Sequence, residues 1–454
     1  MPYLTLPLNS YSHQLTFDEI LDGEVDVSHL FVNNKTNTRT YYKTILPESF
    51  TDSDIAYMIS HLIRFNNMVE TQGISVENLI QHYNTFYVAK SNKGYHYLNQ
   101  QIFNSNTKRS TDPKAMCSEL RSELQPLVNQ HETAIDITVS AEVFENCVRI
   151  VEKYGLSTTV ENFKEYFSSA FRRIDAPDTL LMDSLRSLKR IFEEELHVLH
   201  HTSAFAYVHG RSTADALKRH QRNESKWFAK FDFSNFFGNT TIDFVIDMFS
   251  DIYPFSLIVM NPAGYAALRK ALSFCFLNGG LPQGTPISPM ITNTMMIPVD
   301  HILSNRLREE KERFVYTRYA DDIIISSKID FDVNKLQKYI IDVLKLHRAP
   351  FTLNESKTRY GSSSGQNWNL GLMLNRENNI TVGFRNKKNL KAKIHNFVID
   401  EKGGRSWQKN QIQQLQGLLS YYKSIENDYI SHVLNKYNRK FSCNIEKLII
   451  SKIS

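Results

Sequence analysis

Residues 313–326, RFVYTRYADDIIIS, contain two runs of β-forming residues on either side of two adjacent acidic side chains. The sequence YADD between the runs has the form of a tight turn, so the segment predicts a pair of antiparallel strands. Strands this apolar are expected to be buried, and charges at their junction are costly unless they are paired or bound to a metal. Asp321 and Asp322 are therefore a candidate metal site, and the alternative is that they are ordinary polar turn residues.

A third acidic residue stands in a matching context. The segment 227–237, WFAKFDFSNFF, reads as a buried strand that ends near Asp232, before the turn-prone Ser234-Asn235. Three carboxylates are the oxygen ligands that Mg²⁺ prefers, and two such ions can clamp the attacking and leaving oxygens of a phosphoryl displacement. The alternative is that Asp232 is a helix cap or turn residue.

The segment 278–293, NGGLPQGTPISPMITN, lies between these two acidic stretches. Its glycines and prolines exclude regular structure until Ser288-Pro289, which is expected to open a helix. A glycine-rich loop allows close approach of another backbone or of a base, and Gln283 offers an amide there. By itself this is an unremarkable loop.

The composition bounds the class of protein. The chain has 454 residues, of which 41% are hydrophobic and 22% charged, so we expect a globular protein of two or three domains and exclude disordered and fibrous classes. Its four cysteines form no CxxC pair and are expected to be free thiols. The sequence shows no secretion signal and no apolar run near the ~20 residues of a membrane helix. We therefore expect a cytoplasmic protein with no membrane partner.

Positive charge is concentrated in the C-terminal part. Residues 381–454 hold 14 Lys and Arg against 5 Asp and Glu, whereas the rest of the chain has a small acidic excess. Such an asymmetry suggests a polyanionic partner, and a solvated helical surface is the alternative.

The pattern of apolar and polar residues changes twice along the chain. Amphipathic helical patterns fill most of the first 190 residues, short β-rich runs begin near residue 205, and helical patterns return after residue 380. This predicts a helical N-terminal extension (1–197), a central α+β region (198–380) and a basic helical region (381–454).

Taken together, the motifs resemble those of reverse transcriptases. FDFSNFF, LPQGTPISP, YADD, LNESKT (353–358) and NLGLMLN (369–375) follow the order of the palm motifs, and HGRSTADALKRH (209–220) is similar to the fingers motif. The resemblance covers roughly residues 200–400. It implies an α+β right-hand polymerase with fingers, a palm with an antiparallel sheet and a helical thumb. The implied activity is RNA-directed DNA synthesis from dNTPs on an RNA template.

The resemblance implies a role for each matching residue around the metals. Asp232 and Asp321 would bind two Mg²⁺ ions, with Mn²⁺ as a possible substitute, while Asp322 assists and the carbonyl of Phe233 adds a ligand.

It also implies contacts with the nucleotide. Phe237 would exclude a ribose 2′-hydroxyl, and Gln283 would line the pocket for the incoming nucleotide. Lys357 would donate a proton to pyrophosphate, and Arg211 would contact phosphate. The alternative for these two cations is an ordinary place on the surface.

Further along the chain, the resemblance implies contacts with the nucleic acid. Gly371 would lie in the turn that grips the primer, and the basic stretch 385–409 would follow the duplex as the thumb. The lysines of this stretch that we assign to the interface are Lys387, Lys388, Lys391 and Lys393.

The motifs and the length of the N-terminal extension indicate which subgroup of reverse transcriptases the chain resembles. Retron enzymes typically carry Asn-Ala-x-x-His and Val-Thr-Gly motifs, where this chain reads DALKRH (215–220) and NLG (369–371). The long N-terminal extension is more similar to the defence-associated and abortive-infection reverse transcriptases, which implies phage resistance, a noncoding RNA template and homo-oligomers. The alternatives are a retron-type enzyme, untemplated or protein-primed synthesis, and a non-catalytic RNA-binding scaffold.

Overall fold

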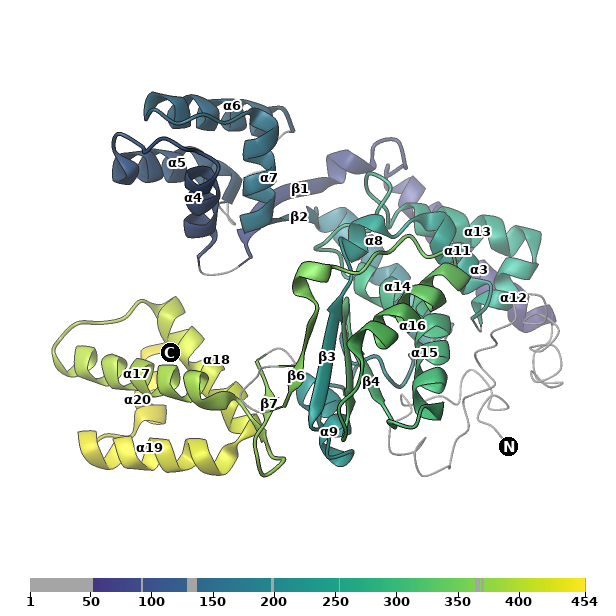
Figure 1. Cartoon of the computed structure of the whole chain (residues 1–454). Coiled ribbons are helices and arrows are strands. Elements are labelled where there is room, and N and C mark those ends of the chain that lie inside the picture. Colours follow the sequence, from purple (N-terminus) through teal and green to yellow (C-terminus); the bar gives the residue numbers. More distant parts are fainter. Residues whose placement is uncertain are drawn as a thin grey trace. The chain divides into compact units, whose positions relative to one another are not determined.

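The computed structural model describes residues 52–90, 93–128, 137–196, 200–252, 254–363, 368 and 371–453. The first 51 residues of the predicted N-terminal extension lie outside the described residues. The described chain divides into two compact units. Figure 1 labels their helices and strands. The first unit contains the residues up to 196 together with Asn235–Met295, and the second contains His200–Ser234 together with the residues from Met296 onward. The units are thus not consecutive in sequence, and the chain-order division into three domains stays a prediction.

The first unit is mainly helical. Its elements in chain order are α3 (Asp52–Thr71), the 3₁₀ turn η4 (Leu79–His82), β1 (Tyr83–Ala89), α4 (Gly94–Asn104), α5 (Pro113–Val128), α6 (Ile137–Lys153), α7 (Val160–Ala170), β2 (Phe171–Pro177), α8 (Thr179–Arg190), the π-helical turn η5 (Ile191–Glu195), α10 (Phe236–Asn239), α11 (Ile242–Phe249), α12 (Phe255–Met260), α13 (Pro262–Ser273) and α14 (Ser288–Met295).

Strands β1 and β2 were not predicted within this mainly helical region. They pair antiparallel over seven residues each, from Tyr83 opposite Pro177 to Ala89 opposite Phe171. The two strands are far apart along the chain, and in both the middle positions are only half-buried or exposed. Neither segment therefore carries the alternating pattern by which a strand is read from its own sequence.

The second unit holds the β-rich centre and the C-terminal helices. Its elements are α9 (Thr213–Arg222), β3 (Trp227–Asp232), α15 (Ile297–Glu309), β4 (Val315–Tyr319), β5 (Asp322–Ser327), α16 (Val333–Leu346), the 3₁₀ turn η6 (Glu355–Lys357), β6 (Arg359–Ser362), β7 (Met373–Leu374), β8 (Ile380–Thr381), α17 (Gly383–Lys402), α18 (Lys409–Ile425), α19 (Asn427–Phe441) and α20 (Ile445–Ile453).

A four-stranded antiparallel sheet in the order β4-β5-β3-β6 positions the predicted site. The hairpin predicted from residues 313–326 is confirmed as β4 and β5, and the predicted strand at 227–232 is β3. The apolar side chains Phe228, Phe231 and Ile323–Ile325 are buried, as the composition of these strands requires. Helices and an antiparallel sheet in one chain confirm the predicted α+β class.

The C-terminal helices share a hydrophobic core with this sheet. Residues of α17–α19, among them Leu390, Phe397 and Ile412, belong to one buried cluster with Phe228 of β3. Trp368 connects the two parts, since its ring stacks on Phe228 with 5.5 Å between centroids. None of the described helices combines the length and the apolar character that a bilayer span requires.

Candidate active site

Three carboxylates meet at one end of the sheet. Asp232 is the last residue of β3 and lies directly opposite Asp322, the first residue of β5. Asp321 occupies the turn between β4 and β5, and its carbonyl accepts a hydrogen bond of 3.3 Å from the backbone N–H of Phe233. The antiparallel register therefore places acidic residues from two distant segments side by side, although like charges opposite each other destabilise a sheet.

Two lysines contact this carboxylate cluster. Lys230 Nζ lies 2.6 Å from an oxygen of Asp322, and Lys357 Nζ lies 2.7 Å from Asp232 Oδ1. Among the described residues Asp321 forms no salt bridge, and no group of three acidic, histidine or cysteine side chains is close enough to hold a metal as it stands. The sequence analysis did not assign Lys230. Its signal was a lysine in an otherwise apolar strand.

The electrostatics of the cluster favour an additional cation. Burial raises the pKa of Asp321, and the charges of Asp232 and Asp322 raise it further. Burial also raises the pKa of Asp322, although Lys230 opposes that shift. Neighbouring carboxylates whose negative charge is only partly offset have the oxygen-donor chemistry that fits a divalent metal ion.

The turn that carries Asp321 has a strained backbone. Ala320 has a φ of 56°, in the left-handed region that residues other than glycine rarely adopt. Its carbonyl accepts a hydrogen bond of 3.0 Å from Arg318 Nη1. Such a conformation costs on the order of 1–3 kcal/mol and persists only when its surroundings impose it.

Arg318 is itself fixed by a buried ion pair. Its Nε and Nη2 donate to the carboxylate of Asp300 at 2.7–3.1 Å, and the Tyr316 hydroxyl donates to the same carboxylate at 2.6 Å. Both charged side chains are inaccessible to solvent. The pair is thus a rigid support from α15 to the turn that carries Asp321, and sequence reasoning missed it because Asp300 shows no motif of its own.

His220 connects α9 to the same two strands. Its ring nitrogens lie 2.6 Å from the Ser326 hydroxyl and 2.8 Å from the Thr317 hydroxyl. Complete burial lowers the pKa of His220 to about 3, so the ring is neutral at physiological pH. This histidine supports the strands behind the carboxylates.

Residues after the sheet complete the surroundings of Asp232. The backbone N–H of Asn354 donates to the carbonyl of Asp232 at 2.8 Å, which places η6 and its Lys357 beside the strand end. The Lys357 side chain is 58% exposed although it contacts the buried Asp232, so its ammonium group remains accessible from solvent.

Phe237 and Gln283 belong to the first unit. The Phe237 carbonyl accepts from the backbone N–H of Leu281 at 2.9 Å, so Phe237 and the glycine-rich loop are neighbours. A Cβ on Gly280 would stand 2.4 Å from the Gly238 carbonyl oxygen, which confirms the expectation that this loop allows a close backbone approach. The Gln283 carbonyl accepts from Asp175 of β2 at 2.9 Å, which anchors the loop.

The remaining predicted residues differ in their surroundings. Arg211 donates to the carbonyls of His201 and Ala204, each at 2.7 Å, and burial lowers its pKa to about 10. This guanidinium therefore supports a loop, and its phosphate contact stays a prediction. Gly371 has a φ of 93°, which suits a turn that requires glycine.

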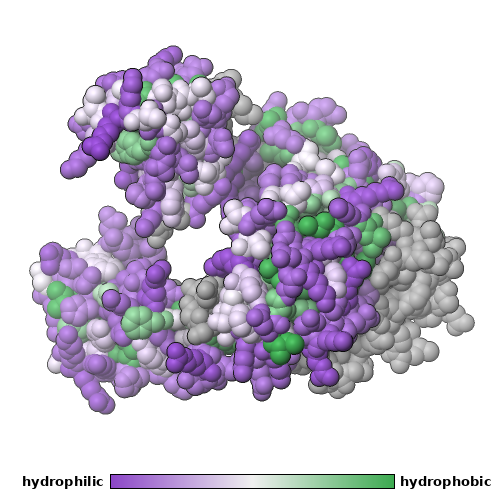
Figure 2. All heavy atoms as spheres, in the orientation of Figure 1, coloured by the Kyte–Doolittle hydropathy of each residue, from purple (hydrophilic) through white to green (hydrophobic). Residues whose placement is uncertain are grey.

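The four lysines assigned to the thumb all lie on α17. Lys387 is paired with Glu426 at 2.6 Å and lies over the ring of Tyr429, so it contributes to the packing of the helices. Lys388 and Lys393 are exposed, and Lys391 is half-buried. Figure 2 shows mainly hydrophilic side chains over these C-terminal helices. The exposed pair, together with Phe384, which is 79% exposed one turn before Lys388, is available to a ligand.

Part of the chain matches a known protein family. Residues 177–396 match the family described as reverse transcriptase (RNA-dependent DNA polymerase). The match includes every site residue predicted from the sequence. It begins within the region that we expected to be an N-terminal extension, at the last residue of β2.

Several relatives are reverse transcriptases of retrons from Escherichia coli. The chain is 27% identical to the retron Ec83 reverse transcriptase over 289 residues, which cover 61% of this chain and 86% of that one. It is 28% identical to the retron Ec73 reverse transcriptase over 53% of this chain and 74% of the relative.

Two telomerases from Candida species are among the solved structures that the comparison found. Apo telomerase from Candida tropicalis has a TM-score of 0.33 at 14% identity, over 45% of this chain and 51% of that one. Telomerase from Candida albicans, solved with a fragment of telomeric RNA, has a TM-score of 0.34 at 12% identity, over 63% of this chain and 58% of that one. This chain thus spans between half and three fifths of those telomerase chains. Residues 177–396 thus carry a reverse transcriptase domain, and the chain is similar to the reverse transcriptases of bacterial retrons.

Proposed function

We propose that the chain makes cDNA by metal-assisted nucleotidyl transfer at Asp232, Asp321 and Asp322. The observation that carries this proposal is the pairing of Asp232 with Asp322 across β3 and β5, with Asp321 in the adjoining turn. Asp232 and Asp321 would hold the metals, with Asp322 and the Phe233 carbonyl as further ligands. Bound Mg²⁺ or Mn²⁺ would supply charge stabilisation at the attacking and leaving oxygens.

The protein's own groups position the reaction. The Arg318 contact fixes the turn that presents Asp321, and Lys230 offsets part of the charge on Asp322. Lys357 contacts Asp232 with an accessible ammonium group, so it is suited to donate a proton to departing pyrophosphate. Phe237 and Gln283 are proposed to select deoxynucleotides and to contact the incoming base.

The biological role is proposed from the relatives and from the C-terminal surface. Identity to two retron reverse transcriptases over most of their length supports a template that is a dedicated noncoding RNA. The exposed lysines of α17 are suited to contact the phosphates of the template–product duplex. A role in resistance to phage is part of the same proposal.

The decisive experiment is primer extension by the full chain on primed RNA with Mg²⁺ and dNTPs. Asp321→Ala plus Asp322→Ala should reduce DNA synthesis by about 10³-fold or more, because two groups at the reacting centre are lost. Glu193→Ala plus Glu194→Ala removes another adjacent acidic pair, whose side chains are exposed in surface ion pairs, and should retain full activity.

Three results separate this proposal from its alternatives. Equal synthesis by both double variants would contradict the assigned site. RNA binding without synthesis by any form would favour a non-catalytic scaffold. DNA that stays attached after protein denaturation and is released by protease would indicate priming from a protein hydroxyl.

A further inference from the structure

Lys230 lies on the same face of the sheet as two of the acidic residues. It precedes Asp232 by two positions in β3, so both side chains project from one face of the strand. Asp322 lies opposite Asp232 in the register and is therefore diagonal to Lys230, within reach of a long side chain. Lys230 Nζ donates to Asp322 Oδ2 at 2.6 Å, so the strand register itself brings this cation to the carboxylate.

The Lys230–Asp322 pair is largely buried. The two side chains are 14% and 15% exposed. Phe228, on the same face of β3, and Ile324, opposite Lys230 in β5, are both buried. Separation of the two charges would leave a buried carboxylate without its counter-ion, which is costly. The pair is therefore expected to persist when a ligand binds at the carboxylates.

The Lys357–Asp232 pair has a different exposure. Lys357 belongs to the 3₁₀ turn η6, and its side chain is 58% exposed although it contacts Asp232 Oδ1 at 2.7 Å. An exposed ammonium group returns to water at little cost, because exposed ion pairs contribute little free energy. Asp232 can thus exchange Lys357 for another cation, whereas one oxygen of Asp322 stays paired with Lys230.

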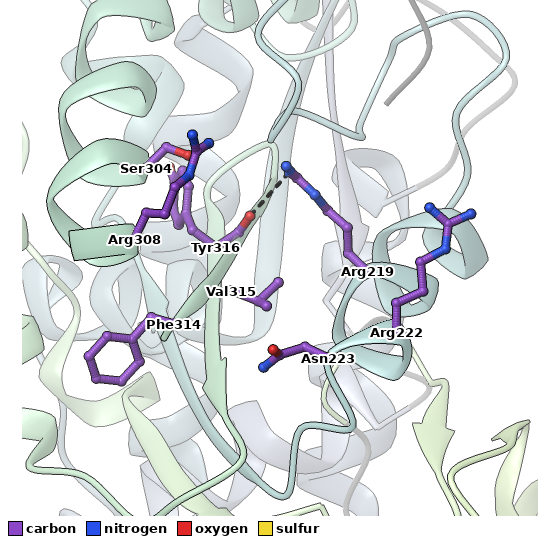
Figure 3. Close-up of a pocket in the computed structure, with 8 residues that line it drawn as sticks. All are labelled: Arg219, Arg222, Asn223, Ser304, Arg308, Phe314, Val315 and Tyr316. Atoms are coloured by element: carbon purple, nitrogen blue, oxygen red, sulfur yellow. Dashed lines mark hydrogen bonds between the residues drawn. The ribbon is translucent and has the colours of Figure 1, made fainter. Parts of the chain in front are cut away.

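Basic side chains elsewhere along the sheet are directed away from the carboxylates. Arg219 lines a pocket of about 300 Å³ and donates to the carbonyl of Tyr316 near the beginning of β4, as Figure 3 shows. Asp321 follows the other end of the same strand. Within the part of the chain that the structure describes, the side-chain cations in contact with the carboxylates are therefore the two lysines.

We propose that Lys230 is a positioning residue that holds Oδ2 of Asp322 and thereby limits the affinity of the carboxylate cluster for divalent ions. The inference deepens the proposed function and rests on it, because it concerns the same three carboxylates. Lys230 leaves Asp322 with one oxygen for other contacts and offsets one negative charge of the cluster. A less negative cluster also repels an incoming triphosphate less strongly.

Lys230→Met is the variant that tests this role. Methionine keeps an unbranched apolar side chain in the buried position and removes the charge. The cluster then carries one more uncompensated negative charge, and both oxygens of Asp322 can contact a metal ion. Mn²⁺ should therefore bind about tenfold more tightly than to wild type. A merely structural role for Lys230 would not produce this gain, because a disturbed site binds an ion no better.

Lys335→Met is the matched control. Lys335 contacts Glu310 at the same 2.6 Å and in the same unit, but neither residue belongs to the carboxylate cluster. The substitution removes the same charge from a lysine–carboxylate pair elsewhere. Its Mn²⁺ affinity should stay within twofold of wild type.

The double variant Asp322→Asn plus Lys230→Met shows whether Lys230 acts through Asp322. Loss of both charges of a buried pair is tolerated better than loss of one, so this variant is expected to fold. Once residue 322 is neutral, the addition of Lys230→Met should change the Mn²⁺ affinity by less than threefold. A tenfold change in this background as well would show that Lys230 acts without Asp322, and would overturn the positioning role.

The measurement is a titration of the full chain with Mn²⁺, in which electron paramagnetic resonance reports the free ion. Circular dichroism verifies that each variant is folded. Lys230→Gln, which retains a hydrogen-bonding group for Asp322, replaces Lys230→Met if that variant does not fold, and the same tightening is expected. Tighter binding that disappears in the Asp322→Asn background supports the inference, and unchanged or weaker binding by the folded Lys230 variant would overturn it.

The Asp321→Ala plus Asp322→Ala variant separates this inference from the proposed function. If that variant binds Mn²⁺ as wild type does, the assigned metal site is wrong, and the inference fails with it. If it binds Mn²⁺ more weakly while Lys230→Met matches wild type, the metal site stands and only the role of Lys230 fails.

Discussion

The helical cluster of the first unit and the sheet of the second unit are built on different physical principles. The buried residues of the cluster formed by α4–α7 and the start of β2 are all apolar, with Phe163 and Phe167 inaccessible at its centre. The sheet also buries aliphatic side chains, but it encloses Asp232, His220 and the Arg318–Asp300 pair among them. Burial of an apolar side chain is favourable, whereas burial of a charge is costly unless it is compensated.

The buried polar groups near the sheet position the acidic residues, whereas the apolar residues of the helical cluster only pack together. These buried polar groups have partners that fix their places: Arg318 has Asp300, Asp232 has Lys357, and His220 has two hydroxyls. The partners support the turn and the strand ends that carry the acidic residues. Among the residues that the structure describes, the helical cluster has no comparable buried polar network, so its sequence is expected to act through stability alone.

Among the variants that test this comparison, the largest expected effect comes from removing the side chain that supports the Asp321 turn. Arg318→Lys keeps a positive charge but loses the bidentate contact with Asp300 and the hydrogen bond to the Ala320 carbonyl. We expect a loss of kcat of about 100-fold, because a misplaced Asp321 no longer matches the reacting geometry. Steady-state primer extension at saturating dNTP measures this.

Tyr316→Phe is the matched control for that change. It removes one hydrogen bond to Asp300 and leaves the Arg318 contacts in place, so it should cost about 1 kcal/mol of stability and leave kcat within a few-fold of wild type. A similar kcat for Arg318→Lys and Tyr316→Phe would show that Arg318 does not position the turn.

The second prediction concerns the stability that the helical cluster provides. Phe163→Ala should lower the free energy of unfolding by about 3–5 kcal/mol, since it removes a fully buried ring. Synthesis per folded molecule should not change. Thermal unfolding and active-site titration give the two values, and Tyr97→Ala, at a 48% exposed position of α4, should leave both nearly unchanged. A fall in specific activity for Phe163→Ala would place this cluster in the catalytic machinery.

The smallest expected effect is that of Asp321→Asn, which should raise the free energy of unfolding, not lower it. Because burial and the neighbouring carboxylates raise the pKa of Asp321, the folded chain binds its proton more tightly than the unfolded chain. The stability that depends on this group is therefore present below the ordinary carboxyl pKa and is lost as pH rises through the raised value. Asp321→Asn should thus stabilise the metal-free protein at pH 8, by about 1 kcal/mol.

The pH dependence supplies the check. The stabilising effect of Asp321→Asn should shrink as pH falls toward the ordinary carboxyl pKa, where wild type is also protonated. Thermal unfolding in EDTA between pH 4.5 and 8 measures the difference, and Asp342→Asn at an exposed position of α16 should show no such trend. A lower melting temperature for Asp321→Asn at pH 8 would contradict the electrostatic account.

The hairpin and the identity of the acidic residues were predictable from the sequence because their signals are local. Two β-forming runs and a turn within fourteen residues are sufficient to place β4 and β5, and the order of the motifs indicates the family. Lys230 interrupts an apolar strand, but neither it nor Arg318 shows its partner in the local sequence. Their partners, Asp322 and Asp300, are fixed only when distant segments pack together.

The same reason explains the missed sheet in the first unit. Strands β1 and β2 are joined across about eighty residues of helical chain, and the loop with Gln283 is anchored on β2 by a single backbone hydrogen bond. Pairing over such a distance depends on the fold as a whole, so propensity along the sequence does not predict it.

The central claim is that Asp232, Asp321 and Asp322 jointly hold divalent ions, and Mn²⁺ binding tests it most directly. The spectrum of free Mn²⁺ in electron paramagnetic resonance, measured during titration of the full chain, counts the bound ions without requiring synthesis. We predict that wild type binds Mn²⁺ and that Asp321→Ala plus Asp322→Ala weakens this binding at least tenfold, while Glu193→Ala plus Glu194→Ala does not. Equal Mn²⁺ affinity in wild type and in the Asp321→Ala plus Asp322→Ala variant would contradict the account.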